Sequence, residues 1–275
     1  MDYTIKSRDI QLTVTDEGGS MRSVIYLPTG EERLWQGGKE WGSRDVVIFP
    51  VIGHADAFCV NGEQYALKSH GIVRYSKLSV ECISENSITL YLVSDEHTKE
   101  NYPYDFLFKI RYEVKDNAIK VVYFVQSKGG RMPFYVGGHP GMVAPKGEAE
   151  IEFANEESPV NYPVGSDGAV KIQKLKRFIA NKQFFKECKT LQLGSLSGGA
   201  VFARTLDGYV YEYNSDCPLL AFWSNEDGGD YICVEPWWGI NDFASAPREL
   251  SLKPYINFDT GLGSVFSYTL SISKE

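Results

Sequence analysis

Residues 106–126 read Phe-Leu-Phe-Lys-Ile-Arg-Tyr-Glu-Val-Lys-Asp-Asn-Ala-Ile-Lys-Val-Val-Tyr-Phe-Val-Gln, two apolar-rich runs on either side of a short polar turn. Runs of β-branched and aromatic residues flanking such a turn predict an antiparallel hairpin, with strands at 106–114 and 118–126. Comparable strand signals recur along the whole chain, whereas helix signals are almost absent. We therefore expect residues 1–275 to form a single all-β domain built from many antiparallel strands.

Turn signals elsewhere in the chain support this expectation. Asn61-Gly62 and Asp207-Gly208 each separate two strand-like runs, and such dipeptides supply the positive φ angles of two-residue hairpin turns. Late strands are expected at 248–253 and 264–273. Residues 155–199 are the least regular part, which we interpret as a connecting excursion at the edge of the sheets rather than a ligand-binding flap.

One short helix is predicted inside that excursion. Residues 172–185 mix basic and apolar side chains at a spacing compatible with a helix. Its expected inward-facing residues are Leu175, Phe178 and Ile179.

Composition excludes several classes of protein. The chain has 28 Lys and Arg against 36 Asp and Glu, a net charge of −8, which argues against binding to nucleic acid or to an anionic membrane surface. The N-terminus lacks the apolar segment of a signal peptide, and no apolar run is long enough to span a bilayer. The five cysteines show no paired spacing, so we expect reduced, packed thiols in a cytoplasmic protein, with no zinc site.

Three short motifs carry groups suited to proton transfer: Ser-His-Gly at 69–71, Gly-Gly-His-Pro at 137–140 and Cys-Val-Glu-Pro-Trp-Trp-Gly at 233–239. Glu235 is the only charge in an apolar run, and burial would raise the pKa of its carboxyl toward the range where it can take and return a proton. Imidazole titrates near neutrality, so His70 or His139, if it faces Glu235, can donate a proton to a substrate while Glu235 accepts one. Neither a metal nor a nucleophile is needed for such chemistry.

The neighbours of His139 admit two interpretations. In an extended strand Tyr135 and Gly137 share a face with His139, and glycine there would leave room for a ligand to approach the ring. On this motif alone, a histidine satisfied by a backbone carbonyl in the core is the simpler interpretation. The aromatic residues Tyr135, Trp237 and Trp238 are candidates for an apolar platform under a bound ligand, or for ordinary core packing.

These motifs resemble those of the aldose 1-epimerase (galactose mutarotase) family. The similar context includes Glu-Arg-Leu-Trp at 32–35, Ile-Phe-Pro-Val-Ile-Gly at 48–53, Asn-Gly-Glu-Gln-Tyr at 61–65 and Phe-Trp-Ser at 222–224. The resemblance implies a large two-sheet antiparallel β-sandwich, the galactose mutarotase-like supersandwich, which strand periodicity alone does not distinguish from a barrel. It also implies an isomerase without a cofactor that acts on a free hexose or a related aldose, as a monomer or homodimer.

Residue roles follow from the same resemblance. It implies that Glu235 is the base at the anomeric hydroxyl, that His139 is the acid at the ring oxygen, and that His70 is a second imidazole near that oxygen. Carboxylate and imidazole are then expected to face each other across a gap wide enough for one pyranose ring.

The chain departs from the family after Ile-Phe-Pro-Val-Ile-Gly, where an arginine usually holds sugar oxygens and His54 stands here. We expect His54 either to contact the ligand or to pack. Arg74 matches the arginine of the family's His-Gly-x-x-Arg run, with sugar contact or a structural salt bridge as its possible roles. A non-catalytic carbohydrate-binding protein of the same fold is the rival hypothesis. A hexose-6-phosphate 1-epimerase would need a cationic grip on the phosphate, and no arginine cluster is evident near the motifs.

Overall fold

Two large antiparallel sheets make up most of the molecule in the computed structural model, which describes residues 1–275 apart from the side chain of Asp56. The first sheet has nine strands, in the spatial order β18 (Leu175–Ala180), β15 (Ala149–Glu157), β20 (Val201–Thr205), β21 (Tyr209–Ser215), β25 (Ser264–Lys274), β11 (Ala118–Ser127), β10 (Phe106–Lys115), β9 (Ser87–Val93) and β8 (Ser79–Ile83). The second has eight, in the order β17 (Val170–Lys171), β16 (Val160–Asn161), β19 (Thr190–Gly194), β22 (Leu219–Trp223), β23 (Tyr231–Trp238), β13 (Val136–Gly138) and β5 (Val47–Ile48), with β14 (Gly141–Val143) also paired to β23. The predicted all-β sandwich is confirmed.

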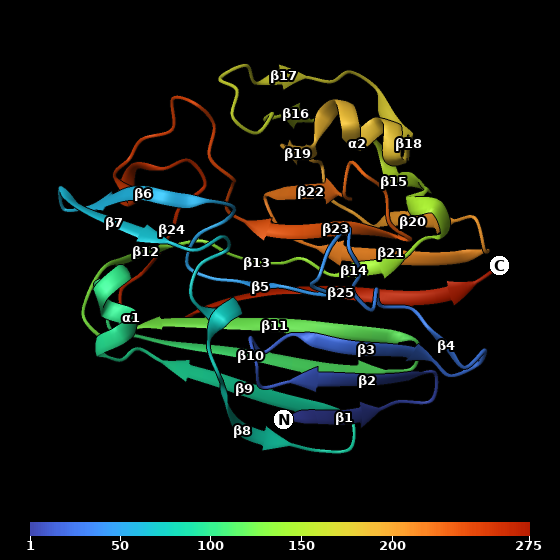
Figure 1. Ribbon diagram of the computed structural model, residues 1–275, viewed down its shortest axis with the longest axis horizontal. Helices are drawn as coiled ribbons and strands as arrows, with labels where there is room; N and C mark the ends of the chain where they lie inside the picture. The colour runs from blue at the N-terminus through green and yellow to red at the C-terminus, as the bar shows by residue number, and fades with distance from the viewer.

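Smaller elements surround the two sheets. A four-stranded sheet, β1 (Asp2–Lys6), β2 (Ile10–Thr15), β3 (Met21–Tyr26) and β4 (Glu31–Glu32), lies across the strands β9 to β11 (Figure 1). The pairs β6 (Ala55–Val60) with β7 (Glu63–Leu67) and β12 (Met132–Phe134) with β24 (Asn257–Asp259) are separate ribbons. The helices are α1 (Glu96–Asn101), α2 (Lys182–Cys188) and three single 3-10 turns, η1 (Val73–Tyr75), η2 (Pro145–Gly147) and η3 (Leu250–Leu252).

Alternation of side chains along the strands builds the core between the sheets. Along β10 every second residue is buried, because successive side chains of a strand point to opposite faces. Aromatic pairs join the two sheets directly: Phe153 of β15 meets Phe222 of β22, and Tyr123 of β11 meets Trp238 of β23, with ring centroids 6.2 and 6.3 Å apart. The buried apolar cluster extends along the chain from Ile5 to Ile272.

The predicted hairpins are confirmed, whereas two other predictions are wrong. β10 and β11 pair in register across Asp116 and Asn117, and turns at Asn61-Gly62 and Asp207-Gly208 join β6 to β7 and β20 to β21. Residues 248–253 form no strand but contain η3. The predicted helix at 172–185 is the edge strand β18 followed by the start of α2, because pairing with β15 provides hydrogen bonds that a lone helix there would lack.

The inward-facing residues of that segment are also partly corrected. Phe178 packs against Phe153 and Phe222, and Leu175 packs on the core, but Ile179 is 47% exposed. Strand geometry explains the difference, because neighbours such as Phe178 and Ile179 point to opposite faces of a sheet.

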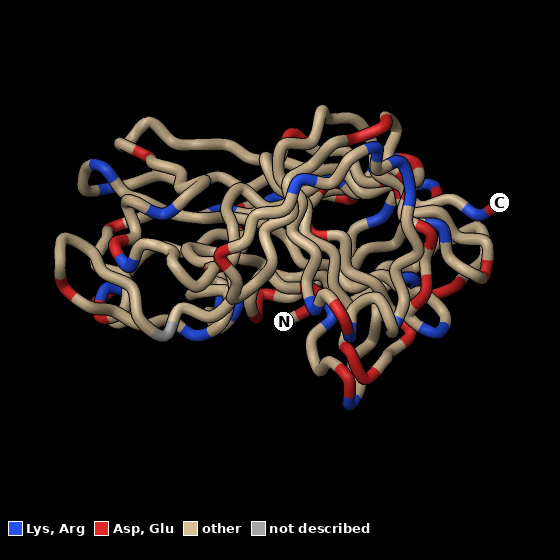
Figure 2. Tube along the Cα trace, turned by 90° about the horizontal axis from the view of Figure 1, so that it is seen from above, with Lys and Arg blue, Asp and Glu red and all other residues tan. Residues whose placement is uncertain are grey.

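Charged residues of both signs are spread over the molecule rather than gathered on one face (Figure 2). None of the helices that the structure describes has the length and apolar character needed to cross a membrane.

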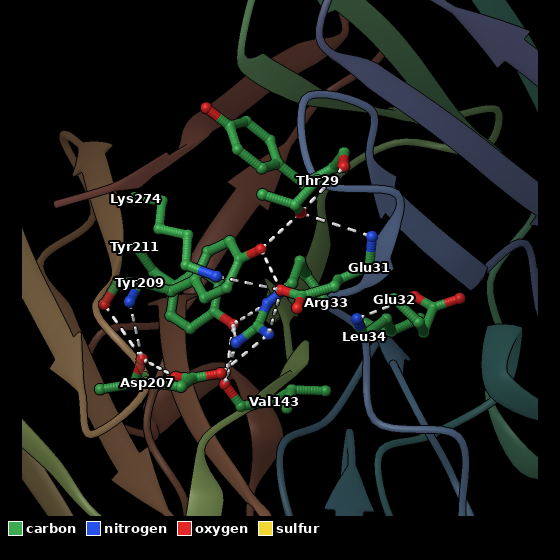
Figure 3. Close-up of polar contacts among 12 residues, drawn as sticks. Thr29, Glu31, Glu32, Arg33, Leu34, Val143, Asp207, Tyr209, Tyr211 and Lys274 are labelled. Atoms are coloured by element: carbon green, nitrogen blue, oxygen red, sulfur yellow. Dashed lines mark hydrogen bonds and ion pairs between the residues drawn. The ribbon is translucent and has the colours of Figure 1, made fainter.

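One buried arginine ties the segment after β4 to the large sheet (Figure 3). The Arg33 side chain is 3% exposed and donates to the hydroxyl of Tyr211 at 2.9 Å, to Asp207 Oδ2 at 3.0 Å and to the carbonyl of Val143 at 3.2 Å. Its guanidinium also lies 3.5 Å from the ring centroid of Tyr209. The charge is therefore paired and hydrogen-bonded, as a buried charge must be.

We predict that Arg33→Ala lowers the free energy of unfolding by about 1–3 kcal/mol, because Tyr211, Asp207 and the carbonyl of Val143 each lose a hydrogen bond to a buried charged group. The matched control is Arg111→Ala, which removes a half-exposed pair with Glu113 and should cost under about 1 kcal/mol. Urea denaturation of both variants measures the difference. Equal costs would show that the Arg33 network does not stabilise the fold.

Candidate active site

Strand register places His139 opposite Glu235. Glu235 lies on β23, all eight residues of which are buried. The short strands β13 and β14 both pair with β23, through Gly137 opposite Trp237 and Gly141 opposite Cys233. β13 and β14 pair with β23 in the same register, and His139 lies between these two short strands. His139 is therefore directly opposite Glu235 of β23. Two groups far apart in the sequence thus meet.

The carboxyl and imidazole of this pair are close but not hydrogen-bonded. His139 Nδ1 lies 3.4 Å from Glu235 Oε2, and among the described residues neither atom has a hydrogen-bond partner. The side chains are 9% and 1% exposed. The expected convergence is present, but the expected gap for a pyranose ring is not, because the strand register brings the two groups into direct apposition. A ligand must therefore lie beside the pair.

His70 is the second imidazole of the site. Its ring centroid lies 5.4 Å from that of His139, with the rings nearly perpendicular. His70 has a positive φ of 68°, and its Nδ1 accepts a hydrogen bond from the backbone N–H of Gly53 at 3.3 Å. An imidazole that accepts at Nδ1 carries its proton on Nε2, so His70 is a neutral donor.

Burial controls the protonation of all three groups. Loss of solvent raises the pKa of Glu235 well above its usual value, although the indole of Trp237 opposes the shift. Loss of solvent lowers the pKa of His139 well below its usual value and that of His70 to about 3, and the positive charge of Arg74 acts on both imidazoles in the same direction. These shifts favour a protonated carboxyl beside neutral imidazoles.

Two tryptophans outside the predicted set of site residues cover His139; Trp223 belongs to the Phe-Trp-Ser stretch, and Trp41 belongs to none of the motifs. The ring of Trp41 stacks on His139 with centroids 5.0 Å apart, and Trp223 meets the edge of His139 at 5.4 Å. Gly141 permits the close approach of Trp41, because a Cβ there would lie 2.5 Å from the indole. Trp41 stands between glycines before β5, and only the folded chain shows which ring that segment covers.

Comparisons with known proteins show which family the chain belongs to. The sequence profile described as aldose 1-epimerase matches residues 1–235. The chain belongs to the aldose 1-epimerase family. Protein LacX of Lactococcus lactis subsp. lactis is 26% identical over an alignment of 283 residues. The alignment covers 92% of this chain and 93% of LacX.

Solved structures of similar fold come from two lactobacilli. The galactose mutarotase related enzyme from Lactobacillus acidophilus superposes with a TM-score of 0.93 and 28% identity, covering 100% of this chain and 98% of that one. A galactose mutarotase-like protein from Lactobacillus casei superposes with a TM-score of 0.91 and 19% identity, covering 99% and 100%. The resemblance noted in the sequence is thereby confirmed at the level of family and fold.

Cys233 lies beside Glu235 and His139. It shares a face of β23 with Glu235, and atoms of Cys233, Glu235 and His139 that can bind a metal all lie within 4.8 Å of one another. Catalytic zinc sites use three ligands of these types, but usually as three histidines, two histidines with a glutamate, or two cysteines with a histidine. The expected absence of a metal stays a prediction, and turnover that survives dialysis against a chelator would support it.

The predicted sugar-contact residues fall into two groups. Tyr135 and Trp237 are buried in one apolar cluster, and the Tyr135 hydroxyl donates to the carbonyl of Pro254 at 2.6 Å. Trp237 fills the space beside Gly137 that the sequence suggested for a ligand, because a Cβ on Gly137 would lie 2.7 Å from the indole. Trp238 packs in the main core against Tyr123.

His54 and Arg74 lie on the His70 side of the site. His54 is exposed, and it is the smallest of the three causes that lower the pKa of His70. Arg74 belongs to η1 and donates to Ser43 Oγ at 3.0 Å. The structural salt bridge considered for Arg74 is not formed with any carboxylate that the structure describes, because its neighbours are hydroxyl and imidazole groups.

We predict that Glu235→Gln changes the pH dependence of stability. Above about pH 4.3 an unfolded glutamate loses the proton that folded Glu235 keeps, so the unfolding free energy of the wild type falls with rising pH by up to about 1.4 kcal/mol per unit. Glutamine carries no such proton. The variant should therefore match the wild type near pH 4 and become relatively more stable toward neutral pH.

Urea denaturation of the wild type and of Glu235→Gln at several pH values measures this difference. A difference that does not change between pH 4 and 7 would show that the Glu235 carboxyl ionises at its ordinary pKa.

Proposed function

We propose that this protein interconverts the α and β anomers of an aldose by general acid–base ring opening and closure. The observation that carries the proposal is the buried apposition of Glu235 and His139, with unpartnered polar atoms on both, beside the neutral donor His70. Membership of the aldose 1-epimerase family supports the same reaction.

The proton transfers balance within the pair. Glu235 as carboxylate takes the proton of the anomeric hydroxyl while His139 as imidazolium gives a proton to the ring oxygen. The bond between C1 and the ring oxygen breaks, and the open aldehyde forms. Rotation about the C1–C2 bond and the reverse transfers close the ring on the other face. Each well-placed acid or base of this kind contributes about 10²–10⁴-fold to the rate.

The resting state leads into this cycle without a change of net charge. Moving one proton from the Glu235 carboxyl to His139 converts the neutral pair into carboxylate and imidazolium. Ring opening then returns both groups to their neutral forms, so the pair alternates between two states of equal total charge. Sugar hydroxyls beside the pair replace some of the solvation that burial removes, which favours the charged state.

Substrate contacts follow from the free donors around the pair. The indole N–H of Trp237 is buried near the Glu235 carboxyl but makes no hydrogen bond of normal geometry among the described residues, which leaves it able to donate to a sugar oxygen. His70 can donate from Nε2 to the ring oxygen, and Arg74 and His54 can hold hydroxyls on the same side. Trp41 must move off His139, or share its ring with the sugar, before a substrate can reach the imidazole.

A second candidate is a non-catalytic carbohydrate-binding protein of the same fold. The exposed His54 at the position of the family's usual arginine favours it, since histidine lacks the permanent charge and rigid donor fork of arginine. Sugar binding without faster anomer exchange would identify this candidate.

We predict that Glu235→Gln keeps sugar binding but loses at least about 10²-fold in the rate of anomer interconversion, because an amide cannot accept a proton at neutral pH. The assay is polarimetry or NMR of freshly dissolved aldoses. The matched control is Glu157→Gln, which alters another buried carboxylate that is bonded to Ser197 at 2.7 Å, away from the pair. It should keep the wild-type rate.

Unchanged turnover in Glu235→Gln would show that Glu235 is not the base. Equal losses in both variants would instead show that a buried carboxylate matters only for folding.

A further inference from the structure

Three groups able to bind a metal ion meet at the Glu235–His139 pair. Atoms of His139, Cys233 and Glu235 that can coordinate a metal all lie within 4.8 Å of one another, and all three residues are buried. Cys233 and Glu235 are two residues apart on β23, so their side chains point to the same face of the strand. The spacing of the five cysteines predicts no zinc site built from paired thiols, but this cluster needs only one thiol.

Two of the ligand atoms lack any other partner. His139 Nδ1 and Glu235 Oε2 are buried and make no hydrogen bond with the residues that the structure describes. Their side chains are 9% and 1% exposed, so solvent does not compensate. Burying a polar atom without a partner costs free energy, and nearly all such atoms in proteins have one. A single bound cation would satisfy both atoms.

The spacing of these two atoms fits a tetrahedral ion. Zinc binds imidazole nitrogen and carboxylate oxygen at about 2.0–2.2 Å, which places two such ligands about 3.3–3.5 Å apart on a tetrahedron. His139 Nδ1 and Glu235 Oε2 are 3.4 Å apart. A thiolate binds zinc at about 2.3 Å and would lie about 3.6 Å from the other two ligands, so side-chain shifts of about 1 Å complete the site.

The ligand set balances the charge of a divalent ion. A metal-bound cysteine is a thiolate and a metal-bound glutamate is a carboxylate, so their two negative charges cancel the two positive charges of the ion. The imidazole of His139 adds a neutral ligand. A complex with no net charge can remain in a dry interior, where an uncompensated ion would be costly.

The donor types select the metal. Mg²⁺ and Ca²⁺ prefer oxygen ligands alone, whereas thiolate and imidazole together suit Zn²⁺. One position of the tetrahedron is left for water, because the cluster supplies only three ligands.

We propose that Cys233, His139 and Glu235 form an inhibitory site for Zn²⁺. The ion binds the carboxyl and the imidazole on which ring opening depends, so the inhibition rests on the proposed function, although the binding site itself does not. With the metal bound, Glu235 cannot accept a proton and His139 is held away from the substrate. The ion enters by the same displacement of Trp41 from His139 that a substrate needs.

The first test measures anomer interconversion by NMR after Zn²⁺ or Mg²⁺ is added to metal-free protein. We expect one equivalent of Zn²⁺ per chain to remove most of the rate, a chelator to restore it, and Mg²⁺ to have no effect. Half-inhibition of Cys233→Ser, relative to its own rate without metal, should need at least about tenfold more Zn²⁺, because even the loss of an outer-shell partner lowers metal affinity by about 10–100-fold. The matched control is Cys82→Ser, which alters an exposed cysteine of β8 and should be inhibited like the wild type.

The position of the ion provides a readout that needs no variant. Anomalous scattering from crystals of the zinc-loaded wild-type protein should locate the ion between Cys233, His139 and Glu235. An ion bound elsewhere, no inhibition by Zn²⁺, or inhibition that Cys233→Ser leaves unchanged would overturn this proposal while the epimerase function stands. If no sugar is turned over even without metal, the epimerase proposal fails, and the position of the ion alone decides whether the metal site exists.

Discussion

Glu235 lies in the middle of a strand whose eight residues are all buried, and its carboxyl can form few of the hydrogen bonds that would support a charge. Burying an ionised carboxylate without such partners is costly, so the group keeps its proton instead. Two features of the site around Glu235 are compatible with a carboxyl that keeps its proton. A break between β13 and β14 puts an imidazole opposite the carboxyl, and aromatic rings exclude water from both.

This constraint links stability to chemistry. A carboxyl and an imidazole that are both neutral are separated by one proton transfer from the charged pair that the proposed ring opening needs. In the proposed reaction, a buried pair would therefore use both charged forms without a change of net charge.

Local signals in the sequence were sufficient for much of the fold. Turn dipeptides such as Asn61-Gly62 and the alternation in β10 act within a few residues, so hairpins could be predicted without tertiary information. The helix predicted at residues 172–185 was wrong because the edge strand β18 is stabilised by pairing with β15, and no local sequence pattern shows that pairing.

The site shows the same division between local and tertiary information. Glu235, His139 and His70 stand in recognisable motifs, so their convergence was predictable. The direct contact of Glu235 with His139 depends on how the short strands pair with β23. The stacking of Trp41 on His139 depends on where the segment before β5 packs.

The most direct test of the account is a double-mutant cycle on anomer interconversion with Glu235→Gln, His139→Gln and the double variant. If the two groups act as one proton-transfer pair, either substitution removes most of the rate, and the double variant is little slower than each single variant. If the rate losses of the two single variants multiply in the double variant, the groups act independently, and the central claim of a coupled pair is contradicted.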